Sequence, residues 1–131
     1  MIVKTFEISK KKLNKESIFL VYGENDGLKF EVIKIIKKKL IGNVENFEET
    51  QILNNVDLFY EKIFNQSLFE KEKIVVINRC TDKITEFING IFKKNLSDIK
   101  IILNANILEK KSKLRKLFEE NKELIIVPTY K

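Results

Sequence analysis

The chain has no histidine and no tryptophan, and only one cysteine and one proline among its 131 residues. Without histidine it lacks the usual general base and the usual zinc ligand, so any catalysis would depend on carboxylates or lysines. The lone Cys80 excludes an internal disulfide and fits a reducing compartment, so we expect a cytoplasmic protein. No apolar run approaches the roughly 18 residues that span a bilayer, and the first residues contain no apolar signal core.

Arginine is also scarce, although the net charge is +6 from 25 basic and 19 acidic residues. Only Arg79 and Arg115 are arginine, and the lysines form short clusters such as Lys37–Lys39. A basic balance favours nucleic acid or an acidic protein as partner. The abundance of lysine, isoleucine and asparagine is also typical of an AT-rich genome, and a protein that reads base edges would be expected to use more arginine. A basic nucleic-acid-binding module therefore remains an alternative function.

Four continuous apolar runs predict strands that are covered on both faces. They are Ile18–Tyr22, Ile74–Ile77, Ile99–Leu103 and Leu124–Val127, with Val44–Phe47 as a weaker strand nearer an edge. Segments of helical period lie between them, at Asp26–Leu40, Gln51–Phe64, Thr81–Lys94 and Leu108–Asn121. This alternation predicts an α/β fold, a five-stranded, mainly parallel sheet with helices on both faces, in a single domain over residues 1–131.

Several local features complete this prediction. Asp26 and Thr81 are the expected caps of their helices, and Gly42 is expected to stop the first of them. Met1–Ile8 is expected to add an edge strand, and Leu13–Glu16 a short helical turn.

The loop after the first core strand resembles a phosphate-binding loop only in outline. Such a loop requires G-x-x-x-x-G-K-[ST]. Here Gly23 and Gly27 are one residue too close, Leu28 precedes Lys29, and Phe30 stands where a magnesium-binding hydroxyl is needed. The sequence therefore predicts a glycine turn and a helix cap, and a catalytic P-loop enzyme is the weaker alternative.

The ends of the next two strands also lack the residues of a nucleotide hydrolase. Asn78 and Arg79 follow the run at Ile74–Ile77, where an acidic residue would hold magnesium. Asn104 is interpreted as a strand-end turn residue, or alternatively as the remnant of a polar sensor. We expect no catalytic residue, no bound cofactor and no metal site, and we interpret Cys80 as a structural thiol.

An apolar pair stands in the polar segment Asn65–Lys73, which is expected to be an exposed connection. Leu68 and Phe69 could anchor the domain in a pocket of a partner protein. Alternatively, both side chains could fold inward and cover the end of the sheet.

The order of these motifs resembles the delta subunit of the bacterial DNA polymerase III clamp loader. The resemblance rests on Ile18–Asp26, which reads IFLVYGEND, on Asn65–Ile77, which reads NQSLFEKEKIVVI, and on Ile101–Lys111, which reads IILNANILEKK. It covers nearly the whole chain and matches the N-terminal domain of that family. The most specific part is Ser67-Leu68-Phe69 followed by a charged residue and a strand.

The resemblance implies an AAA+ module with a degenerate nucleotide site that binds the sliding clamp, the beta subunit of the polymerase, and opens it. Its Leu–Phe pair would enter the hydrophobic pocket of the clamp, so the implied clamp-binding residues are Ser67, Leu68 and Phe69. The resemblance further implies that other loader subunits are partners, that DNA is met indirectly within the loader, and that the domain catalyses nothing itself although it belongs to a polymerase holoenzyme. The lid and collar domains of that family have no counterpart in these 131 residues, and the collar mediates loader assembly.

Overall fold

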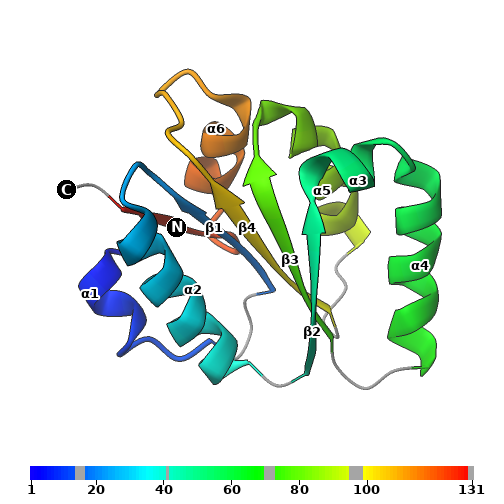
Figure 1. The fold of residues 1–131 in the computed structure, drawn as a ribbon, viewed down its shortest axis with the longest axis horizontal. Coiled ribbons are helices and arrows are strands. Elements are labelled where there is room, and N and C mark those ends of the chain that lie inside the picture. The colour runs from blue at the N-terminus through cyan, green and yellow to red at the C-terminus, as the bar shows by residue number, and fades with distance from the viewer. Residues whose placement is uncertain (14–16, 41, 70–72, 95–98, 130–131) are drawn as a thin grey trace.

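The computed structural model describes the chain except residues 14–16, 41, 70–72, 95–98 and 130–131, and it describes only the backbone of residues 64–69. Five strands alternate with helices (Figure 1). The strands are β1 Ile18–Tyr22, β2 Asn43–Glu48, β3 Lys73–Cys80, β4 Ile99–Ala105 and β5 Ile125–Pro128. The helices are α1 Thr5–Ile8, α2 Asp26–Lys39, α3 Glu49–Leu53, α4 Val56–Phe69, the 3₁₀ turn η1 Asp82–Ile84, α5 Thr85–Lys94 and α6 Lys113–Glu120.

The strands form one sheet in the order β2-β3-β4-β1-β5, and every pairing between them is parallel. β1 lies inside the sheet, where Leu20 is paired with Leu103 of β4 and with Ile126 of β5. All five residues of β1 are buried, as expected for a strand covered on both faces. The predicted α/β class, the five strands and the edge position of β2 are confirmed.

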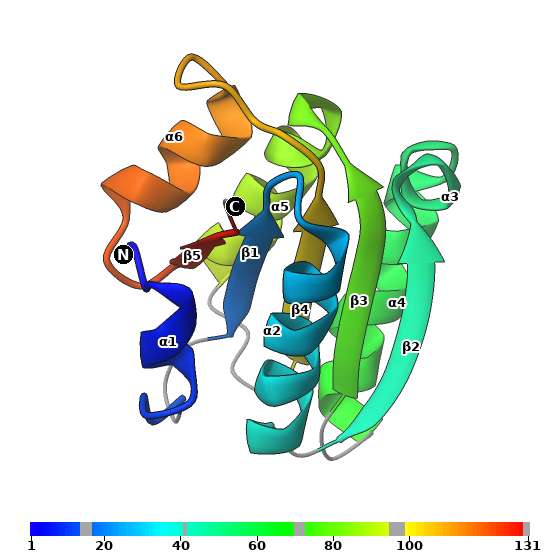
Figure 2. The ribbon, with the colours of Figure 1, turned by 60° about the vertical axis from the view of Figure 1, so that its left-hand side comes forward.

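Helices cover both faces of the sheet (Figures 1 and 2). On one face, α3, α4, α5 and α6 pack on a cluster that includes Leu20, Tyr22 and Leu103. On the other face, α1 and α2 pack on a cluster that includes Phe19 and Val21. Neighbouring residues of β1 thus enter opposite clusters, because successive side chains of a strand point to opposite faces.

The predicted edge strand at Met1–Ile8 is only partly correct. Ile2 forms an isolated parallel bridge with Ile126 of β5, and Val3 donates a backbone hydrogen bond to the Ile126 carbonyl at 2.9 Å. The chain then turns into α1, where the carboxylate of Glu7 accepts a hydrogen bond from the Lys4 backbone N–H at 3.0 Å. This local cap favours a helix over a longer strand. Of the turn predicted at Leu13–Glu16, Leu13 is not helical and the other residues lie outside the described structure.

One helix cap and two helix boundaries differ from the predictions, and polar residues account for each difference. Asn25, and not Asp26, caps α2, and its side chain accepts a hydrogen bond from the Leu28 N–H at 3.1 Å. The helix predicted at Gln51–Phe64 is two helices, separated by Asn54 and Asn55. Both residues compete well for turn conformations, which accounts for the break.

The last predicted helix begins at Lys113 and not at Leu108, because Ser112 caps it and accepts a hydrogen bond from the Arg115 N–H at 3.1 Å. The cap predicted at Thr81 is confirmed, since its hydroxyl accepts from the Lys83 N–H at 3.2 Å. Gly42 follows the end of α2 with a φ of +144°, a conformation that favours glycine.

Within the part of the chain that the structure describes, there is no helix with the length and apolar character needed to cross a membrane.

Candidate functional site

The connection from β1 to α2 lies at the carboxyl edge of the sheet, where open parallel sheets commonly bind ligands. Only Gly23, Glu24 and Asn25 lie between the two elements. Gly23 has a φ of +136°, and its N–H donates to the Asn106 carbonyl at 3.1 Å. A Cβ on Gly23 would lie 2.3 Å from the carbonyl oxygen of Thr129, so the loop is pressed against the chain that follows β5.

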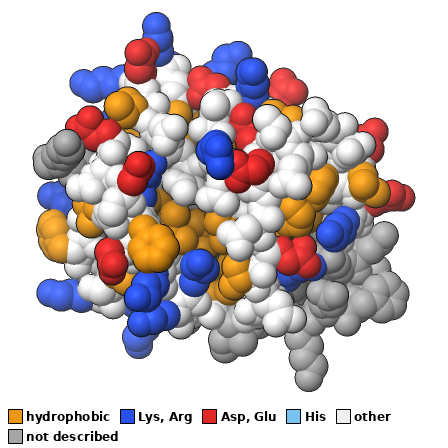
Figure 3. All heavy atoms as spheres, in the orientation of Figure 1, with side chains coloured by type: hydrophobic (Ala, Val, Ile, Leu, Met, Phe, Trp, Pro, Cys, Tyr) orange, Lys and Arg blue, Asp and Glu red, His pale blue; other side chains and the backbone are white. Residues whose placement is uncertain are grey.

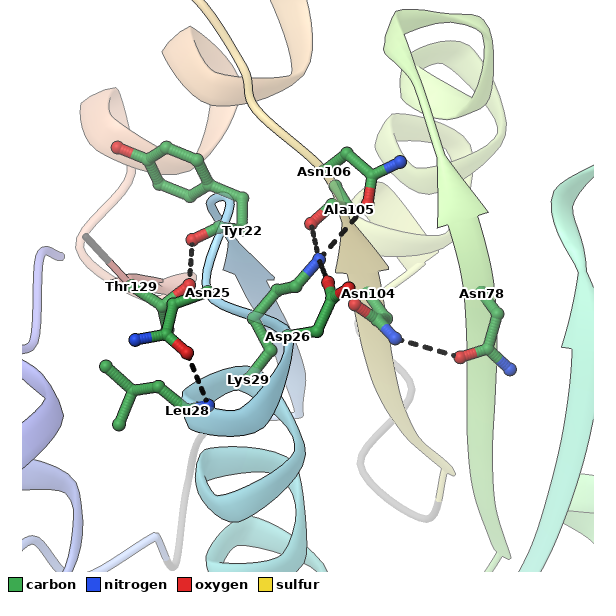
Figure 4. Close-up of polar contacts among 10 residues, drawn as sticks. All are labelled: Tyr22, Asn25, Asp26, Leu28, Lys29, Asn78, Asn104, Ala105, Asn106 and Thr129. Carbon is green, nitrogen blue, oxygen red and sulfur yellow. Dashed lines mark hydrogen bonds and ion pairs between the residues drawn. The ribbon is translucent and has the colours of Figure 1, made fainter. Parts of the chain in front are cut away.

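Lys29, which stands near the position of a phosphate-binding lysine, points into the protein (Figure 4). Its ammonium donates to the Ala105 carbonyl at 3.0 Å and to Oδ1 of Asn106 at 3.2 Å, and it lies 3.2 Å from a carboxylate oxygen of Asp26. A lysine ammonium has three donors, and these three acceptors use all of them. Only 5% of the side chain is exposed. Lys29 therefore ties the first turn of α2 to the end of β4.

Asn78 and Asn104 were interpreted separately from the sequence, but the structure brings them together. Asn104 donates from Nδ2 to Oδ1 of Asn78 at 3.1 Å (Figure 4). The expectation that these residues follow their strands is wrong, since Asn78 lies within β3 and Asn104 lies within β4. The strands continue because β3 and β4 remain paired to Cys80 and Ala105, with an irregularity between Ile77 and Cys80.

The irregularity in β3 presents Arg79 at the surface. Arg79 has a φ of +56°, and its guanidinium forms an ion pair with Glu48 at 2.7 Å. Cys80, the next residue, is buried, and burial raises the pKa of its thiol far above the ordinary value. A thiol of this kind is not a nucleophile at neutral pH, which agrees with the structural role predicted for it.

Ser67, Leu68 and Phe69 form the end of α4. The prediction of an exposed loop across Asn65–Lys73 is therefore wrong at both ends, because α4 continues through Asn65 to Phe69 and the buried Lys73 begins β3. The side chains of Ser67, Leu68 and Phe69 lie outside the described structure, so the predicted anchor remains a prediction. The backbone places the three residues at the amino edge of the sheet, away from the Gly23 loop, because α4 leads into β3 (Figure 1).

A groove that the sequence does not predict lies between α2 and the adjacent face of the sheet. We call it the sheet-face groove, and its volume is about 460 Å³. Phe30, Ile33, Lys34 and Lys37 of α2 form its wall, and Asn46, Val76, Asn78 and Asn104 form its floor. Figure 3 shows hydrophobic side chains gathered in the middle of this face with lysine or arginine side chains beside them.

The groove exists because α2 covers only part of this face of the sheet. α2 packs in front of β1 and β4, while β2 and β3 extend beside it with no described helix in front of them (Figures 1 and 2). Two features of the sequence bear on the groove: the aromatic Phe30 on a surface helix, and Asn46, Asn78 and Asn104 in three different strands. Neither feature predicts the groove by itself, because the asparagines become neighbours only through the strand order.

No protein-family model matches the chain, and no curated protein sequence is significantly similar to it. Among solved structures, the crystal structure of RIF2 from Saccharomyces cerevisiae has a similar fold, with a TM-score of 0.55 and 17% sequence identity. The match covers 97% of this chain and 53% of the RIF2 chain, so this chain spans about half the length of that relative. At this identity the likeness concerns the fold alone, and it agrees with the α/β architecture described above.

Proposed function

We propose that the chain is a sliding-clamp-binding and clamp-opening domain of a DNA polymerase III clamp loader, acting in the cytoplasm without ATPase activity of its own. The observation that carries the proposal is the sequence Ser67-Leu68-Phe69 at the end of α4, directly before β3, on a parallel α/β domain. The order of elements supports it as well, because the resemblance to the delta subunit requires this succession of strands and helices.

The position of α4 suits a contact with another protein. α4 is held to the domain by buried Ile63, by Phe59 packed on Phe47 at a centroid distance of 5.0 Å, and by Tyr60, whose hydroxyl donates to the Phe87 carbonyl at 3.0 Å. Its first turn carries Leu58, which is 58% exposed. Because α4 is already held in place, the apolar pair at its end could enter a pocket of a partner with little further ordering of the helix, which lowers the entropy cost of binding.

The energy available from the anchor is limited. Burying a leucine and a phenylalanine contributes about 1.5–3 kcal/mol each. Such an anchor provides affinity, but opening a ring requires that the domain bind the open state better than the closed state. A second contact must therefore supply this difference, and the exposed face of α4 around Leu58 is the surface that we assign to it.

The absence of ATPase activity is supported by the contacts of Lys29. Its three donors are used within the protein, so binding a phosphate would require breaking the contacts with Ala105 and Asn106. The short loop Gly23–Asn25 also contains too few residues to surround a phosphate in the manner of a P-loop. The catalytic P-loop alternative is accordingly the weaker one.

The test is binding to the cognate sliding clamp, measured by calorimetry and by pulldown. The double variant Leu68→Ala/Phe69→Ala is expected to lose detectable binding and to keep the circular dichroism spectrum of the parent. Its matched control is Phe6→Ala/Ile107→Ala, which removes the same kinds of side chain from positions 68% and 65% exposed. Parent-like affinity in the first variant, or equal losses in both, would remove the anchor assignment.

A further inference from the structure

The sheet-face groove is lined by lysine ammonium groups, asparagine amides and an exposed aromatic ring, each of which can contact a ligand. Its volume of about 460 Å³ lies within the range of roughly 300–1,000 Å³ typical of ligand sites, so a base and its sugar would fit. The groove lies on the face of the sheet opposite α4. It is therefore separate from the surface to which clamp binding is assigned.

The charge of the groove is positive. Lys34 and Lys37 stand on its wall, and neither forms an ion pair with a described residue. Asp26 is the only carboxylate among the lining residues, and it is paired with Lys29. The nearby Glu48 is paired with Arg79. An anion that enters the groove would therefore meet lysines and no unpaired carboxylate among its lining residues.

The floor of the groove presents amides. Asn46 is exposed and makes no side-chain hydrogen bond with a described residue. The bond between Asn104 and Asn78 uses one donor and one acceptor, which leaves donors on Nδ2 of Asn78 and an acceptor on Oδ1 of Asn104. Donors and acceptors side by side match the edge of a base, which also carries both.

The rim of the groove carries an aromatic ring. Phe30 lines the groove and is 66% exposed, although Val32, Ile33 and Ile36 of the same helix are buried. Any of the bases can stack on an exposed aromatic ring. A positively charged groove with such a ring is the usual arrangement for binding single-stranded nucleic acid.

We propose that the sheet-face groove binds single-stranded DNA, with a base stacked on Phe30, its edge at Asn46, Asn78 and Asn104, and the adjacent phosphates at Lys34 and Lys37. The choice of DNA over RNA rests on the proposed function, which places the domain in a loader that handles DNA. The rest of the inference depends only on the groove.

A peptide fits the groove less well. A strand added to the sheet would pair with the free edge of β2 and not with this face, because the backbone groups of β3 and β4 are already paired with neighbouring strands. An amphipathic helix would place its apolar side over Asn46, Asn78 and Asn104 and leave their amides without hydrogen bonds, which is unfavourable.

The test is fluorescence anisotropy of a short labelled oligodeoxythymidine with the full chain, at salt concentrations between about 50 and 200 mM. Phe30→Ala is expected to weaken binding about tenfold, since stacking on one aromatic ring is lost. Lys34→Ala/Lys37→Ala is expected to reduce the slope of log affinity against log salt by about 1.4, because each phosphate contact to a single strand contributes about 0.7.

The controls have matched chemistry at other places. Phe6→Ala removes a phenylalanine that is 68% exposed on α1, and Lys93→Ala/Lys94→Ala removes two exposed lysines from α5 on the opposite face. Both are expected to bind the oligonucleotide like the parent. All of these changes are at exposed or half-exposed positions, and melting temperatures verify that each variant is folded.

Four outcomes of the oligonucleotide-binding measurements would overturn the inference. They are no binding by the parent at about 50 mM salt, equal losses in groove and control variants, tighter binding of duplex DNA, and tighter binding of the matching RNA. Loss of clamp binding by Phe30→Ala, with oligonucleotide binding unchanged, would overturn it too and would make the groove a protein interface. Parent-like clamp binding by Leu68→Ala/Phe69→Ala would remove the anchor assignment and leave the groove inference standing, so the two proposals fail separately.

Discussion

The carboxylate of Asp82 accepts a hydrogen bond from the hydroxyl of Ser112, and the two residues come from the start of η1 and the cap of α6. Asp82 also accepts from the backbone N–H groups of Lys113 and Leu114, at 3.2 and 3.4 Å. A carboxylate from another part of the chain thus reinforces the Ser112 cap, and α6 begins where these contacts are available. This relationship accounts for the late start of α6 relative to the helical pattern of the sequence.

Asp82→Asn is expected to lower the free energy of unfolding at neutral pH by about 1 kcal/mol, because the hydrogen bonds to a charged acceptor are weakened. Burial alone would raise the pKa of Asp82, but the bonds from Ser112, Lys113 and Leu114 outweigh it and lower the pKa below the ordinary 3.8. A carboxyl group whose pKa is lower in the folded state stabilises the protein at pH values above its pKa in the unfolded state. This stabilisation is lost as the pH falls toward the pKa of the folded state.

Urea unfolding measures the free energy of unfolding of the parent and of the Asp82→Asn variant. The difference between the two free energies should be largest at neutral pH and should shrink below about pH 3.8. Glu123→Gln, at an exposed carboxylate with no contact among the described residues, is the control and should show no difference. A difference that grows on acidification would contradict the assigned role.

Gly23→Ala and Gly27→Ala are expected to have opposite effects. At Gly23 a Cβ would lie 2.3 Å from the carbonyl oxygen of Thr129, and the backbone φ of +136° is unfavourable for alanine. We therefore expect Gly23→Ala to lower the free energy of unfolding by about 3 kcal/mol. At Gly27, in the first turn of α2, the nearest atom is 3.7 Å away, so alanine should stabilise by about 0.5–1 kcal/mol. Denaturant midpoints measure both, and equal effects would show that the Gly23 loop is not packed as described.

Lys29→Met is expected to destabilise the protein by about 2 kcal/mol, because acceptors at Ala105 and Asn106 lose a charged donor in a buried place. Lys38→Met, at an exposed position of the same helix, should change stability by less than about 0.5 kcal/mol. Thermal unfolding measures both effects.

The same measurement with and without ATP and magnesium separates a structural lysine from a phosphate-binding one. Ligands that bind the folded state raise the unfolding temperature. We expect no ATP-dependent shift in the parent or in Lys29→Met. A saturable shift in the parent that Lys29→Met abolishes would restore the P-loop alternative.

Leu58→Ala tests the second clamp contact assigned under the proposed function. We expect clamp binding to fall only a few-fold while ring opening, followed with a fluorophore pair across the clamp interface, falls by a larger factor. The reason is that Leu58 lies at the other end of α4 from the anchor and would engage one state of the ring. Parallel losses in binding and opening would assign Leu58 to affinity alone.

The sheet could be predicted from the sequence because runs such as Ile74–Ile77 are continuously apolar and β-branched, which is typical of a strand covered on both faces. The helix ends were less predictable. The break at Asn54 and the start at Lys113 depend on hydrogen bonds, some of them from distant residues such as Asp82. Periodicity identifies the buried face of a helix but does not say which side chain will reach its first N–H groups.

The groove could not be predicted for a related reason. Asn46, Asn78 and Asn104 are separated by long stretches of sequence, and they share a floor because β2, β3 and β4 are adjacent and parallel. Leu68 and Phe69 illustrate the opposite case, because the pair stands out in the sequence but its secondary structure does not. The polar residues at Asn65–Ser67 favour a loop, yet they are compatible with a helix, and α4 continues through them.

The position of β2 at the rim of the sheet has a consequence for self-association. An edge strand offers unpaired backbone groups to any passing chain, and such edges commonly seed aggregation. Here the strand carries Glu45, whose carboxylate lies 2.6 Å from the ammonium of Lys73 and 3.7 Å from that of Lys62. A second molecule that paired with this edge would have to desolvate these charged groups, which is unfavourable. The charges on and beside β2 therefore oppose edge-to-edge association of the domain.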